Sequence, residues 1–191
     1  MTDDREREEE TKEEKEKANL EEAVDKLYEK RSSIREEGYA TLSKSLRSRV
    51  CRDTIEGKWE TITDFIARSC RRGGSAEVRA AAELSEILSV TLGQNQHFYE
   101  LISPSLTTLC NELADPAPGT SSSAAAASSS DQSAAATSAV IRALGTACFF
   151  ASEDPQDIVK CTSLMRTLFK SRLAQAASAA MAFIGSSRSF S

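Results

Sequence analysis

The chain has 191 residues, 40% of them hydrophobic and 28% charged, with a net charge of −5 at pH 7. This length suits one domain, and the lack of any apolar run of about 18 residues argues against a transmembrane helix. The first residues are almost all charged and lack the apolar core of a secretory signal, which argues against export by that route.

Charge changes sign along the first part of the chain. Residues 1–30 carry 13 acids and 7 bases, whereas residues 31–72 carry 10 bases and 6 acids. Residues 1–18 have no apolar face to bury, so a disordered arm is favoured over a solvated helix. The basic stretch that follows can meet nucleic acid or another anionic partner. A solvated protein surface is the simpler interpretation of the same residues and is favoured.

Apolar residues recur at helical spacing from Leu20 onward, and no segment shows the alternation of a strand. Pro104 should kink one helix or divide it into two. Asp154 and Pro155 predict the start of a helix that buries Ile158, Val159 and Phe169. The predicted helices cover about 20–30, 33–50, 53–72, 75–92, 96–113, 133–149, 155–169 and 173–184.

Residues 114–132 interrupt the helical pattern. Two prolines and a glycine precede runs of Ser and Ala, a composition typical of a flexible low-complexity loop. Loops of this length inside a compact domain are functional or disordered, and we expect a disordered Ser/Ala-rich insertion at 114–132. The chain then divides into the charged arm 1–18, a helical domain at 19–185 that contains this insertion, and a tail at 186–191.

A helical motif recurs at a spacing of 44 residues. Ile34-Arg35 and Val78-Arg79 hold equivalent positions, and a weaker copy starts at Ser133. Two-helix units with periods near 40–47 residues are typical of HEAT and armadillo repeats. The sequence therefore predicts an all-α fold, an armadillo/HEAT-like right-handed helical solenoid of about seven to eight helices. Such solenoids bind macromolecules along a face, which favours a scaffold over an enzyme. Arg35 and Arg79 are expected to pair between adjacent repeats.

No set of residues predicts catalysis, a metal or a cofactor. His97 is the single histidine and is expected at the surface, without the positioned partner that acid–base chemistry needs. The five cysteines are widely spaced, lack the close pairs of a zinc site, and are expected to be mostly buried, reduced thiols of a cytosolic or nuclear protein. Trp59 is expected in the core, with a partner-binding anchor as the alternative. We predict no enzyme activity and no small-molecule substrate.

Arginines near the ends of the second and third predicted helices are the candidate site for a partner or for RNA. Arginine suits bidentate contacts with phosphate or carboxylate, although a basic residue at a helix C-terminus also stabilises the helix dipole. In antiparallel hairpins these two ends fall on opposite edges, so the two groups need not form one patch. The candidate residues are Arg47, Arg49, Arg52, Arg68, Arg71 and Arg72.

Several ordered blocks of the chain resemble the interferon-related developmental regulators. The similarity covers about residues 19–170, and its most specific block is RALGTACFFASEDP at 142–155. The other blocks are LEEAVDKLYEKR at 20–31, LSKSLRSR at 42–49, ETITD at 60–64 and GGSAE at 73–77.

The resemblance implies an armadillo/HEAT-like domain and a transcriptional co-regulator that acts through protein partners in the nucleus and cytoplasm. One branch of this family binds translationally inactive ribosomes, which implies an alternative: a translation regulator that docks a basic edge on RNA. Regulatory proteins are thus the expected partners, ribosomes or RNA the alternative, and membranes are not expected. The family's domain normally continues past this segment, so we expect a truncated form of it. The Ser/Ala-rich insertion departs from the family's short connection.

Overall fold

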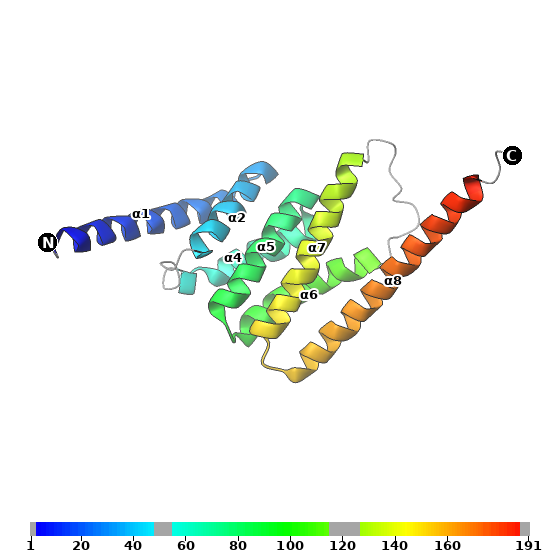
Figure 1. Ribbon diagram of the computed structural model, residues 1–191. Helices are drawn as coiled ribbons and strands as arrows, with labels where there is room; N and C mark the ends of the chain where they lie inside the picture. Colours follow the sequence, from blue (N-terminus) through cyan, green and yellow to red (C-terminus); the bar gives the residue numbers. More distant parts are fainter. Residues whose placement is uncertain (1–2, 48–54, 115–126, 188–191) are drawn as a thin grey trace.

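The computed structural model describes residues 3–47, 55–114 and 127–187, and these residues form helices joined by short turns (Figure 1). No strand occurs in these three ranges. The all-helical fold that the sequence predicts is confirmed. The described helices are α1 (Asp3–Leu27), α2 (Ser32–Arg47), α4 (Trp59–Arg72), α5 (Ser75–Leu92), α6 (Gln96–Ala114), α7 (Ala127–Phe150) and α8 (Pro155–Ser187).

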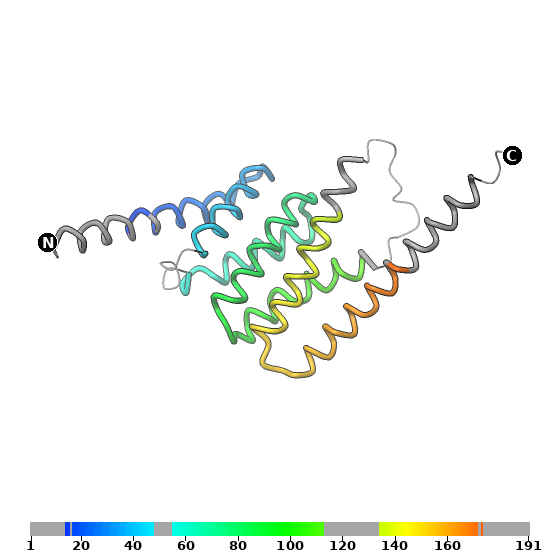
Figure 2. Tube along the Cα trace, viewed as in Figure 1, coloured from blue at the N-terminus to red at the C-terminus, as the bar shows by residue number. Residues whose placement is uncertain are grey.

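The helices stack as hairpins in two layers (Figures 1 and 2). In sequence order, α1 packs on α2, α4 on α5, and α6 on α7, after which α8 packs on α7. Within one layer α2, α5 and α7 are neighbours, and within the other α4, α6 and α8 are neighbours. This two-layer stack is compatible with the armadillo/HEAT-like solenoid that the repeat spacing predicts.

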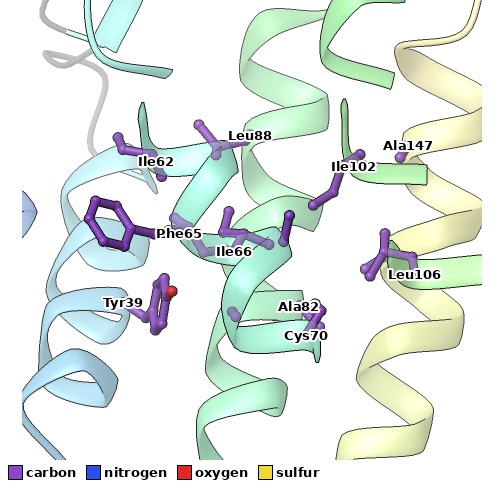
Figure 3. Packing of buried hydrophobic residues seen from close by; sticks show 14 of the residues in the cluster. Tyr39, Ile62, Phe65, Ile66, Cys70, Ala82, Leu88, Ile102, Leu106 and Ala147 are labelled. Atoms are coloured by element: carbon purple, nitrogen blue, oxygen red, sulfur yellow. The ribbon is translucent and has the colours of Figure 1, made fainter. Parts of the chain in front are cut away.

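A continuous apolar core lies between the two layers and takes side chains from every described helix. Figure 3 shows part of it, where Ile62 and Ile66 of α4 are packed among residues of α2, α5 and α6. Small side chains such as Ala82, Ala143 and Ala147 are fully buried where α5 meets α7. Small residues let helix backbones approach closely, which explains how a chain with few aromatic residues builds this core.

Two glycines are required by the geometry of the stack. A Cβ atom at Gly38 of α2 would lie 3.0 Å from the carbonyl oxygen of Ala23 and 3.0 Å from the Leu27 side chain, both in α1. Gly38 therefore sets how closely the first hairpin closes. Gly93 ends α5 with a φ of 66°, a conformation that other residues adopt only at a cost.

The charged arm differs from its prediction. Residues 3–18, for which disorder is favoured by composition, form the first half of α1. Glutamate, lysine and arginine have high helix propensity, and the second half of α1 is fixed to the core through Leu20 and Leu27. Extending an existing helix avoids the cost of nucleating a new one, so the arm continues the packed segment.

Two helix boundaries also differ from the predictions. The third predicted helix is interrupted, because a turn at Gly57 and Lys58 separates the helical residues 55–56 from α4, which begins at Trp59. Asp53 lies outside the described residues. Of the predicted insertion, residues 115–126 lie outside the described residues, whereas 127–132 already belong to α7. Only Ala127 among these residues is an alanine, the strongest helix former, so the helix reaches them as an extension of the segment that packs on the core from Ala136 onward. Of the two alternatives expected for Pro104, division of the helix does not occur, because Pro104 lies inside a continuous α6.

The last two predicted helices form one helix, α8. No glycine or proline interrupts the chain between Phe169 and Leu173, so nothing ends the helix there. The start is as predicted: the Asp154 carboxylate accepts a hydrogen bond of 2.8 Å from the Gln156 amide ahead of Pro155. The predicted burial of Ile158, Val159 and Phe169 is wrong, because α8 is covered by α6 and α7 on one side only.

Candidate functional site

The structure separates the candidate arginines into two groups. Arg47 is the last residue of α2, whereas Arg68, Arg71 and Arg72 lie in the last turns of α4, and all four are exposed. Arg49 and Arg52 lie outside the described residues.

The two groups lie on opposite edges of the stack. Helices α2 and α5 run side by side, and Arg35 in the first turn of α2 contacts Glu77 in the first turn of α5. At the other end Arg47 lines a groove with Glu86 and Val90 near the end of α5. A helix of 18 residues such as α5 is roughly 27 Å long, so Arg47 is remote from the arginines of α4. The described arginines therefore do not form one patch.

A basic and aromatic cluster forms where α4 ends beside the turn between α1 and α2. We call it the basic-aromatic corner and define it by Tyr28, Lys30, Phe65, Arg68 and Arg72, which line one hollow of about 280 Å³. The rings of Tyr28 and Phe65 meet edge to face with centroids 4.6 Å apart, and the Arg68 guanidinium lies 5.2 Å from the centre of the Phe65 ring. Such cation–π contacts hold an arginine in place without neutralising its charge.

The sequence prediction missed three members of this corner: Tyr28, Lys30 and Phe65, the last of which was expected only as part of the apolar face of its helix. Tyr28 and Lys30 lie about 40 residues before Arg68 and Arg72, and only the packing of the first two hairpins brings them together. Lys30 resembles an ordinary helix-terminal base in the sequence. Arg71, which the sequence groups with Arg68 and Arg72, instead donates a hydrogen bond of 3.2 Å to the Ser105 hydroxyl of α6.

An ion pair between Arg35 and Glu77 lies beside the corner and fixes the backbone next to it. Arg35 donates two hydrogen bonds to the Glu77 carboxylate, from Nε to Oε1 at 2.8 Å and from Nη2 to Oε2 at 2.7 Å. Its Nη1 donates to the carbonyl oxygens of Glu29 and Lys30, at 2.9 and 2.8 Å. One guanidinium thus fixes the end of α1 and joins α2 to α5, as predicted for Arg35. Arg79 does not make the equivalent contact, because it pairs with Glu83 within its own helix.

The Glu77 carboxylate is held ionised inside the protein. Its side chain is 2% exposed, and burial by itself raises the pKa of a carboxyl group. Hydrogen bonds from Arg35 and Ser69 outweigh that effect and hold the pKa of Glu77 below its usual value. Ser69 donates its only proton to Glu77 at 2.6 Å, so the buried Tyr39 hydroxyl must be the donor in its 2.8 Å bond to Ser69.

A second surface lies on the layer of α2, α5 and α7. Its groove has a volume of about 520 Å³ and is lined by Leu46, Arg47, Glu83, Glu86, Ile87, Val90, Thr91 and Arg142. Arg142 of α7 lies 3.4 Å from the Glu86 carboxylate of α5, which ties the second and third hairpins together beside the groove. The lining mixes apolar side chains (Leu46, Ile87 and Val90) with charged ones, as protein-binding surfaces do.

The remaining residues considered as possible sites are the metal-ligating side chains, His97, Trp59 and the cysteines. Within the ranges that the structure describes, no three His, Cys, Asp or Glu side chains are grouped so that they could hold a metal ion. His97 is exposed as predicted, 3.6 Å from the Glu60 carboxylate and edge to face with Trp59. Trp59 is partly buried against the core. Cys70, Cys110 and Cys148 are buried free thiols and Cys161 is half-buried.

Comparison with known proteins shows which family this chain belongs to. The sequence model of the interferon-related developmental regulators matches residues 1–186, nearly the whole chain. The chain belongs to the interferon-related developmental regulator family. The resemblance carried by the short blocks at 20–155 is thereby confirmed.

Two curated interferon-related developmental regulators show how distant the relationship is. The chain is 27% identical over 161 residues to interferon-related developmental regulator 2 of Mus musculus, covering 82% of this chain and 33% of that protein. It is 27% identical over 146 residues to interferon-related developmental regulator 1 of Sus scrofa, covering 76% and 29%. The chain thus spans about a third of the length of these relatives. No solved structure matches it significantly.

The relatives are named as regulators, and both surfaces suit contact with other macromolecules. The corner presents cations and an exposed aromatic ring, and the groove presents apolar residues between charges. None of the described helices is both long and apolar enough to cross a bilayer.

Proposed function

We propose that this chain is a non-enzymatic helical-repeat scaffold that regulates transcription by docking protein partners, in the nucleus and the cytoplasm. Membership of a family of developmental regulators supports a regulatory role. The observation that carries the proposal is the open groove along α2, α5 and α7. Repeat proteins of this kind use the surface formed by successive parallel helices to bind extended partners.

Val90 is the residue of this groove that a partner would cover first. Its side chain is 54% exposed, although valine is usually buried. Ile87 lies one turn earlier and is partly buried beneath it, while Glu86 and Arg47 supply charge at the sides. A partner helix or strand with an apolar side chain at its centre would remove Val90 from water and keep the flanking charges paired.

Proximity labelling in cells tests this function with a matched pair of variants. Val90→Glu places a charge in the groove, and Val159→Glu places the same charge on α8, where Val159 is exposed to a similar degree at 58%. We expect Val90→Glu to lose nuclear protein partners that the wild type and Val159→Glu retain. Equal partner recovery by both variants would exclude the groove, and the absence of regulatory proteins from all three samples would exclude the scaffold role.

A second candidate function, ribosome-associated translation regulation, is favoured by the convergence of Lys30, Arg68 and Arg72 on one edge. Phosphate contacts weaken steeply with added salt. Sedimentation of lysate through sucrose at low and raised salt tests this function. We expect salt-sensitive migration with ribosomes, abolished by reversing Arg68, Arg71 and Arg72 to Glu. Migration near the top of the gradient at both salt concentrations would count against it.

A further inference from the structure

The cations of the basic-aromatic corner lack carboxylate partners in the described structure. Elsewhere on the described surface, Lys26, Lys58, Arg79, Arg142 and Lys160 each pair with a carboxylate, whereas Lys44, Arg47, Arg166 and Lys170 form no ion pair with a described acid. The corner differs from these single cations because three of its cations line one hollow. No ion pair links Lys30, Arg68 or Arg72 to an acid within the described ranges, and the one buried acid beside them, Glu77, is already neutralised by Arg35. The other acid that lines the hollow is Glu29, so the three cations outnumber its single charge and favour binding of an anion.

The same corner exposes an aromatic ring beside these charges. The Tyr28 side chain is 65% exposed even though its ring edge meets the nearly buried Phe65. The hollow of about 280 Å³ is of the size that one large side chain occupies. Tyrosine and arginine are the residues that most often dominate protein interfaces, because they offer large contact area together with hydrogen-bonding groups.

We propose that the basic-aromatic corner binds an acidic segment of a partner protein, with carboxylates on Arg68 and Arg72 and an apolar or aromatic side chain against Tyr28. The inference rests on the proposed scaffold function and names the chemistry of one class of partner. Charge complementarity carries it: the corner offers guanidinium groups that match carboxylates in geometry, and an apolar surface next to them.

The acidic surroundings favour a short peptide over a nucleic acid strand. Exposed Asp25 lies one turn before Tyr28 in α1, exposed Asp64 lies one turn before Arg68 in α4, and Glu29 lies between Tyr28 and Lys30. An RNA strand carries a phosphate at every nucleotide and would pass these carboxylates as it left the corner. A peptide can place two acids on the arginines and continue with neutral residues.

Fluorescence polarisation with the full chain tests the proposal directly. The probe is a fluorescein-labelled peptide with two acidic residues, Asp and Glu, and two Phe residues in an otherwise neutral sequence. It is compared with a peptide in which Asn and Gln replace the acids. An oligouridine with the same number of negative charges is the nucleic acid probe. The corner variant is Arg68→Glu with Arg72→Glu, and the matched control is Arg166→Glu with Lys170→Glu, exposed on α8. Circular dichroism shows whether both variants keep their helices.

We expect the acidic peptide to bind the wild type and the α8 control equally. The corner variant should lose about tenfold or more in affinity, because each carboxylate–guanidinium pair is a charge-assisted contact. Tyr28→Ala should weaken binding and leave its salt dependence unchanged, because it removes apolar contact and no charge. The neutral peptide should not bind.

Three outcomes would overturn the proposal. The acidic peptide does not bind, or the corner and α8 variants lose the same affinity for it. The third is that oligouridine binds in preference to the peptide, which would support the ribosome role. Partner recovery in cells is a separate readout. If nuclear partners are recovered through Val90 while the peptide does not bind, only this inference fails; if neither occurs, the scaffold function fails as well.

Discussion

Arg35 and Glu77 form a bidentate ion pair that joins the first helical hairpin to the second. Among the described residues, this pair makes the shortest contact between charged side chains of different helices, at 2.7 Å, and only 2% of the Glu77 side chain is exposed. The carboxylate also accepts a bond from Ser69, so three elements, α2, α4 and α5, meet at one acid. Leaving one member of such a buried pair alone is strongly destabilising.

Arg35→Ala should therefore lower the free energy of unfolding by about 3 kcal/mol, since it leaves the buried Glu77 carboxylate without its cation. Urea denaturation followed by circular dichroism measures this loss. Arg79→Ala is the control: it breaks an exposed pair within one helix and should cost less than about 0.5 kcal/mol. Equal effects of the two substitutions would show that the pair between hairpins contributes no more than a surface contact.

The same pair predicts how stability depends on pH. The folded-state pKa of Glu77 lies below its ordinary value of 4.5, so its contribution is complete above about pH 4.5 and is lost as pH falls through the folded pKa. Glu77→Gln removes this titration. We expect the variant to be less stable than the wild type at pH 7 and the difference to shrink below pH 4.5. A constant difference between pH 7 and pH 3 would contradict the assignment.

The close contact at Gly38 predicts that a side chain at this position destabilises the first hairpin. Gly38→Val must push the α1 backbone at Ala23 away from α2, and we expect a loss of about 1–3 kcal/mol, as for other overpacked sites. Gly57→Ala is the control, because a Cβ atom there meets nothing within 4 Å. Thermal unfolding should separate the two. A fully tolerated valine at position 38 would mean that α1 does not pack on α2 as closely as described.

The cysteines predict slow thiol chemistry in the folded state. Burial raises the pKa of Cys70 to about 12, of Cys110 to about 11 and of Cys161 to about 12, and it also raises the pKa of Cys148. Only the thiolate reacts with iodoacetamide, so these thiols should react at least about tenfold more slowly than in urea. The measurement uses Cys51→Ser, since Cys51 lies outside the described residues. Rapid alkylation of the native variant would contradict the described burial.

The sequence was sufficient for the all-helical fold and for two of the five residues of the basic-aromatic corner, Arg68 and Arg72. Apolar spacing locates the helices, because burial of one face imposes a period that the chain shows directly. The basic-aromatic corner could not be found this way, since Tyr28 and Arg68 meet only through packing between hairpins. The sequence did not predict the exposure of Phe169 for the same reason. Helical spacing places an apolar residue on one face of a helix, but the neighbouring helices decide whether that face is covered.

The four hydrogen bonds of the Arg35 guanidinium have a mechanical consequence. Nη1 holds the carbonyl groups of Glu29 and Lys30, next to the Tyr28 ring, while Nε and Nη2 hold the joint between α2 and α5. The segment that shapes the corner and the contact between two hairpins are therefore attached to the same rigid plane of atoms. A ligand that fixes the Glu29–Lys30 segment would therefore also restrict movement of α2 against α5. By the same coupling, a change in the angle between the two hairpins would change the shape of the corner.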